Sequence, residues 1–130
     1  MIALDTNVLV RMFVDDDVAQ TQRVRELLDS RTLLILPTVL LEAEWVLRGA
    51  YELDPSRIAS MLRALFGLPN VKIANIEAVG QALAWFEAGL GFADALHLAL
   101  AAEADEGFAT FDKRLERRAQ RLAIRNVVAV

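Results

Sequence analysis

The stretch MIALDTN (residues 1–7) decides how the rest of the chain is interpreted. Met1–Leu4 is an apolar run without polar alternation, which is typical of a strand covered on both faces, and Asp5-Thr6-Asn7 ends it abruptly. Similar short apolar runs recur along the chain, separated by segments with helical periodicity. The sequence therefore predicts further strands at 33–36, 71–74, 107–111 and 127–130.

Between these runs, apolar residues recur with the period of a helix. Asp17 and Gln20 form a capping-box arrangement, Thr38 can cap a second helix, and Asp54-Pro55 pairs a cap with proline at the first helical position. We expect helices opening at 17 and spanning 38–47, 55–66, 78–88, 93–103 and 113–121. This alternation predicts an α/β fold: a single domain over residues 1–130, with three layers (α/β/α) around a central parallel sheet of about five short strands.

Composition excludes several classes of protein. The 130 residues are 55% hydrophobic and include no cysteine, which argues against a disordered chain and against a disulfide-stapled secreted module. Without a secretory signal pattern or an apolar run of membrane-spanning length, we expect a cytoplasmic protein that does not enter a membrane. The net charge is −4, yet residues 113–125 alone carry +5. The chain therefore has one basic segment, and the rest of its residues are acidic overall.

Four carboxylates stand where a site is expected. Asp5 and Asp112 follow predicted strands, and ligands of open α/β sheets bind at the carboxyl ends of strands. Glu42 and Asp94 lie in helices that are apolar nearly all round, with no Lys or Arg beside them. If the four converge, a cation must offset their repulsion and desolvation, and oxygen ligands favour Mg²⁺ or Mn²⁺.

Each acid also has a structural interpretation. Asp5 and Asp94 can cap a helix, Asp112 can end a strand in a turn, and Glu42 can face solvent. Glu44 lies about 200° around the helix from Glu42, so the two cannot both face one site. Taken together, the placements at strand ends favour an acidic cleft.

At these residues the sequence resembles PIN-domain ribonucleases, and in particular the toxins of VapBC toxin–antitoxin pairs. The motifs that carry the resemblance occur in order along the whole chain: Asp5-Thr6-Asn7, Glu42 ahead of Trp45-Val46-Leu47, Asp94-Ala95-Leu96-His97 and Thr110-Phe111-Asp112. The resemblance implies an endoribonuclease in which the four acids bind one or two Mg²⁺ or Mn²⁺ ions. It also implies that Asn7 and Thr110 support the site by hydrogen bonding, and that a metal-activated water hydrolyses RNA.

An acidic site does not attract a polyanion, so phosphate contacts are expected from basic side chains elsewhere. The candidates for binding substrate are Arg11, Arg48 and some of the arginines of the basic segment, namely Arg114, Arg117, Arg118 and Arg121, with Arg11, Arg114 and Arg117 placed first. The alternative for the basic segment is a solvated helix face with local pairing to Glu116.

The resemblance further implies a homodimer that a cognate VapB-like antitoxin holds inactive. Apolar surface on helix 39–47 or 55–66 would suit such a partner. Three alternatives stay open: a hydrolase of small phosphoesters, a catalytically silent interaction module, and a PIN nuclease that processes RNA without a toxin role. Asn7 counts against the first because a haloacid-dehalogenase site needs an acid there. Retention of the four acids counts against the second, and the small size favours a toxin over the third.

Overall fold

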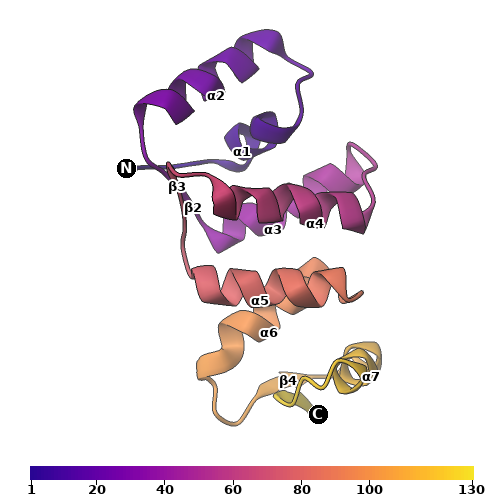
Figure 1. The fold of residues 1–130 in the computed structure, drawn as a ribbon. Helices are drawn as coiled ribbons and strands as arrows, with labels where there is room; N and C mark the ends of the chain where they lie inside the picture. The colour runs from indigo at the N-terminus through magenta and orange to yellow at the C-terminus, as the bar shows by residue number, and fades with distance from the viewer. The chain divides into compact units, whose positions relative to one another are not determined.

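Seven α-helices and five short strands alternate along the chain in the computed structural model, which describes residues 1–130 (Figure 1). The chain divides into two compact units, residues 1–75 and 76–130, and each has its own parallel sheet. All five predicted strands are present: β1 (Ile2–Ala3), β2 (Leu33–Ile35), β3 (Val71–Ile73), β4 (Phe108–Thr110) and β5 (Val127–Ala129).

The first unit contains a three-stranded sheet in the order β1-β2-β3. Ile2 is paired with Leu33, and Leu33 with Val71, so β2 is hydrogen-bonded along both edges. Leu33 and Ile35 are fully buried, as their apolar run predicts. The helices of this unit are α1 (Thr6–Phe13), α2 (Val18–Ser30), α3 (Pro37–Gly49) and α4 (Pro55–Ala64), which the 3-10 turn η1 (Leu65–Gly67) extends.

The second unit joins a helical hairpin to a two-stranded sheet of β4 and β5. The rings of Phe86 and Phe92 meet edge to face, with centroids 5.3 Å apart, and hold the hairpin together. On the last helix, Leu115 and Ala119 are buried while the basic side chains are exposed. The helices here are α5 (Ile76–Glu87), α6 (Phe92–Leu100) with the 3-10 turn η2 (Ala101–Glu103), and α7 (Lys113–Arg121).

Two predicted helix starts are confirmed by side-chain caps. The Asp17 carboxylate accepts a hydrogen bond from the Gln20 N–H at 3.0 Å and opens α2. Asp54 does the same for α4, accepting from the Arg57 N–H at 2.8 Å, with proline in the first turn. In both cases a local sequence signal is sufficient, because the cap satisfies an N–H of the helix's own first turn.

Two other features of the first unit differ from the predictions. Thr38 does not cap α3, which begins at Pro37 with Leu36 at the N-cap position. Proline suits the first helical position because its fixed φ is helical and it has no N–H to satisfy. The helix α1 is not among the predicted helix spans, although the sequence offers Asp5 as a cap for a helix at this point. Thr6, Leu9 and Val10 are buried at helical spacing, and α1 packs against α2 and α3.

The turn before β4 requires glycine. Gly107 has φ +104°, and a Cβ at this position would lie 2.8 Å from the Asn126 carbonyl oxygen and 2.9 Å from Cγ2 of Val128. A side chain would therefore collide with β5 and with the backbone just before it. Glycine lets β4 pair closely with β5, and β4 carries the chain to Thr110 and Asp112.

The predicted fold class is confirmed. Helices alternate with strands that all run parallel, which fits a three-layer α/β/α fold. The five strands are distributed as three in the sheet of the first unit and two in the sheet of the second. None of the helices has the length and apolar character needed to cross a membrane.

Candidate active site

Asp5 lies directly after β1, at the N-cap position of α1. Its carbonyl accepts hydrogen bonds from the N–H groups of Val8 and Leu9, both at 3.1 Å, but its side chain makes no capping bond. The residue is exposed, as is Asn7 in the first turn of the same helix. Capping therefore accounts for the backbone of Asp5 only, and its carboxylate is available to a ligand.

Glu42 and Glu44 point to different environments, as their spacing on α3 predicts. Glu42 is exposed and makes no hydrogen bond. Glu44 is only 3% exposed, and its carboxylate accepts hydrogen bonds from Arg48, at 2.8 Å from Nε and 3.4 Å from the terminal nitrogen. This pairing raises the pKa of the Arg48 guanidinium. Glu44 is thus committed to a structural ion pair, and Glu42 is the carboxylate of α3 that can bind a ligand.

Asp94 lies in the first turn of α6, where Gly91 occupies the N-cap position. The side chain is half-buried and makes neither a hydrogen bond nor an ion pair. Asp94 does not cap α6, and its carboxylate is free.

Asp112 caps α7. Its Oδ1 accepts hydrogen bonds from the N–H groups of Arg114 and Leu115, at 2.9 and 3.1 Å. Its own N–H donates to Oγ1 of Thr110 at 2.9 Å, which fixes the turn between β4 and α7. Both capping bonds use one oxygen, so Oδ2 has no partner. Asp112 therefore combines a structural role with a free oxygen, and Thr110 contacts the residue that it is expected to support.

The four carboxylates are divided between the two units. Asp5 and Glu42 belong to the first, and Asp94 and Asp112 to the second. Neither unit by itself contains a group of three His, Asp or Glu side chains that could hold a metal ion. Each of the four acids offers at least one unpartnered carboxylate oxygen, which is the type of ligand that a hard divalent cation such as Mg²⁺ or Mn²⁺ prefers.

The basic candidates differ in how far they are engaged. The Arg11 guanidinium is held by three partners in the first unit: it pairs with Asp16, donates to Gln20 at 2.7 Å and contacts the Tyr51 hydroxyl at 3.3 Å. Arg114 and Arg117 lie on α7, are exposed and make no ion pair. The predicted pairing of this helix with Glu116 is not formed. Arg114 and Arg117 are therefore free to contact phosphate, and Arg11 is not.

The sequence also matches a known protein family. The sequence model of the PIN domain matches residues 2–121, which is nearly the whole chain. The chain belongs to the PIN domain family. No curated protein sequence matches the chain. The PIN domain is a nuclease-type fold, its members are generally metal-dependent nucleases, and PIN nucleases act on RNA.

The family match extends across both units of this PIN domain and includes all four candidate acids. The structure also reveals features that the motifs do not indicate. Trp45 on α3 is 66% exposed and Phe111, directly before Asp112, is 82% exposed. The Glu44–Arg48 pair was also missed, although its i,i+4 spacing on one helix is a recognisable signal.

Proposed function

We propose that this PIN domain is a metal-dependent endoribonuclease in which Asp5, Glu42, Asp94 and Asp112 together hold Mg²⁺ or Mn²⁺. The observation that carries the proposal is the family match over residues 2–121, combined with an unpartnered carboxylate oxygen on each of the four acids. The proposal requires the two units to act as one domain over residues 1–130, because each contributes two of the ligands.

The four acids and their neighbours have distinct tasks in this proposal. The bound ion supplies an activated water and offsets charge on the phosphate oxygens. Thr110 holds the turn that carries Asp112, while the α7 cap fixes one oxygen of Asp112 and leaves the other for the ion. Asn7, exposed on α1, supports the site from the side of Asp5. Exposed Arg114 and Arg117 contact the RNA backbone through charge-assisted hydrogen bonds.

Cleavage of total cellular RNA by the purified protein tests the nuclease. With Mg²⁺ or Mn²⁺ we expect discrete fragments, and none with EDTA or with Asp94→Asn. A suitable control is Asp29→Asn, which removes an exposed carboxylate from α2 outside the four candidates. Fragments that persist in Asp94→Asn, or their absence with wild-type protein saturated with metal, would contradict the proposal and favour a silent interaction module.

We propose further that the protein acts as a VapC-like toxin, as a homodimer in the cytoplasm controlled by a VapB-like antitoxin. The motif resemblance supports this role, and the exposed Trp45 on α3 offers apolar surface for an antitoxin helix. Expression without a partner should arrest growth, and expression of Asp5→Asn should not. Normal growth together with metal-dependent cleavage in vitro would instead assign an RNA-processing role.

A further inference from the structure

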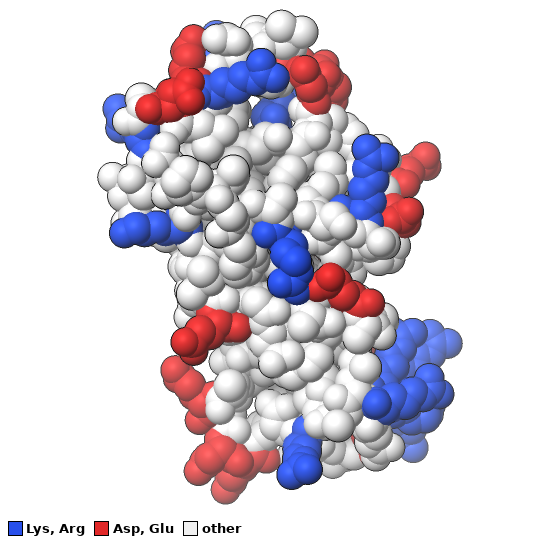
Figure 2. Space-filling view, in the orientation of Figure 1, with Lys and Arg blue, Asp and Glu red and all other residues white.

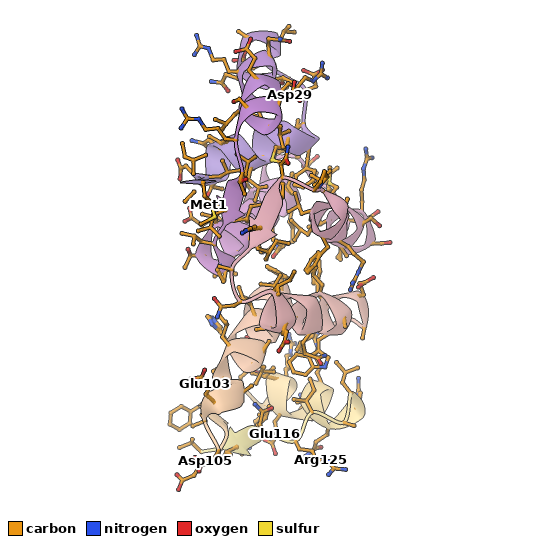
Figure 3. All side chains as sticks on the ribbon, turned by 60° about the vertical axis from the view of Figure 1, so that its left-hand side comes forward. Met1, Asp29, Glu103, Asp105, Glu116 and Arg125 are labelled. Carbon is orange, nitrogen blue, oxygen red and sulfur yellow. The ribbon has the colours of Figure 1, made fainter.

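The basic side chains of α7 form a cluster that no acid neutralises. Figure 2 shows blue side chains gathered over α7, while one group of red side chains lies on the opposite side of the second unit. Glu103 and Asp105, which Figure 3 labels, lie away from α7. Glu116 is the only acid of the helix, and it makes no ion pair. Like charges held together without partners destabilise the helix face unless an anion binds to them.

Four of these side chains surround one depression. Its volume is about 140 Å³, and its lining consists only of Arg114, Arg117, Arg118 and Arg121. A lining made entirely of arginine side chains is complementary to a phosphate, which a guanidinium can bind through two parallel hydrogen bonds.

A second depression of a different character adjoins the first. It has a volume of about 270 Å³ and shares Arg118 and Arg121 with the arginine depression. The rest of its lining comes from the end of α7 and from the α5–α6 loop: Ala88, Gly89, Leu90 and Leu122. A lining that combines apolar residues with two arginines suits a nucleobase, because arginine can stack on flat aromatic rings.

We propose that α7 and the α5–α6 loop form a nucleotide subsite for single-stranded RNA, with a phosphate in the arginine depression and the adjoining base in the second depression. A purely acidic peptide such as polyglutamate would pair with the arginines, but it has no flat ring or apolar side chain to place in the second depression. The pair of depressions therefore favours RNA. The inference rests on the proposed ribonuclease function, since it assigns part of the substrate to this surface. It assigns Arg118 and Arg121 to one defined subsite, because these two side chains line both depressions.

Binding without cleavage isolates this subsite from catalysis. Fluorescence anisotropy of a labelled single-stranded RNA, with EDTA present, should show affinity lowered at least tenfold by the double variant Arg118→Gln/Arg121→Gln. Loss of the contact to this one phosphate should also flatten the dependence of log affinity on log salt by about 0.7, which is the contribution of one neutralised phosphate on a single strand.

The matched control is Arg23→Gln/Arg57→Gln, which removes the same charge from exposed positions on α2 and α4. We expect it to change affinity less than twofold. Equal losses in the two double variants would overturn the inference, because overall charge alone would then explain binding.

The base pocket has its own test. Ala88 is exposed at the rim, so Ala88→Leu fills the pocket without disturbing the core. It should weaken RNA binding at least fivefold and leave binding of inorganic polyphosphate unchanged. An unchanged RNA affinity, or displacement of RNA by polyglutamate as effective as by polyphosphate, would overturn the inference. The two proposals fail in different assays. Failure of the subsite is seen as unchanged RNA binding by the α7 variants in EDTA, whereas failure of the nuclease is seen as the absence of metal-dependent cleavage by the wild-type protein.

Discussion

The two glutamates of α3 allow an effect on catalysis to be separated from an effect on folding stability within a single helix. Glu42 and Glu44 are two positions apart, yet one is exposed and unpartnered while the other is buried against Arg48. The matched substitutions Glu42→Gln and Glu44→Gln change the same charge by the same chemistry. We expect Glu42→Gln to abolish cleavage without affecting folding. We expect Glu44→Gln to lower the stability of the fold while most of the cleavage activity is retained.

The expected magnitudes follow from the contacts. Glu44→Gln removes the carboxylate charge, so Arg48 donates to a neutral acceptor and the ion pair is lost. The Arg48 side chain is 53% exposed, so solvent screens part of this loss. The unfolding free energy should fall by about 1 kcal/mol, which lowers Tm by about 3–5 °C for a domain of this size. Glu42→Gln removes no contact and should change stability by less than about 0.5 kcal/mol.

Activity should show the opposite order. A metal ion supplies several kcal/mol of charge stabilisation, and each 1.36 kcal/mol corresponds to tenfold in rate, so weakening its coordination at Glu42 should lower kcat about 100-fold or more. Glu44→Gln should retain most of the wild-type rate. Thermal unfolding by circular dichroism and Mn²⁺-dependent cleavage of a labelled RNA measure both effects. An active Glu42→Gln variant, or equal inactivation of both variants, would refute the assignment.

Other substitutions test individual contacts. Asp112→Ser keeps a capping oxygen but removes the charge, so the free energy of unfolding should stay within about 0.5 kcal/mol of wild type while cleavage is lost. A fall of about 2 kcal/mol in the free energy of unfolding, measured by urea titration, would contradict this. Gly107→Ala should lower stability by about 1–3 kcal/mol, because a Cβ would lie 2.8 Å from the Asn126 carbonyl; an unchanged urea midpoint would show that the turn tolerates a side chain. Glu44 raises the pKa of Arg48, so the contribution of this ion pair to folding stability is fully present below the ordinary pKa of arginine. That contribution is lost only as pH rises through the raised pKa. The Tm difference between wild type and Glu44→Gln should therefore be constant from about pH 7 to 9, and a steep change in that window would disagree.

The features that sequence predicts best are those set by neighbouring residues. The caps at Asp17 and Asp54 depend on an N–H three positions away, and both form as predicted. The five apolar runs also become strands, because runs without polar alternation are suited to burial on both faces.

What sequence could not predict depends on distant packing. Arg11 was a candidate substrate contact, yet its guanidinium is held partly by Tyr51, 40 positions along the chain. The candidate site shows the same division: the motifs identify the four acids, but only the structure shows that Asp112 also caps α7.

Calorimetric titration of the intact chain with Mn²⁺ tests the central claim most directly, because it measures whether acids from both units hold one ion. The account predicts saturable binding that is unchanged in Glu44→Gln. It predicts binding at least tenfold weaker in each of four variants: Asp5→Asn, Glu42→Gln, Asp94→Asn and Asp112→Asn. Absence of saturable binding, or sensitivity to the acids of one unit alone, would contradict it.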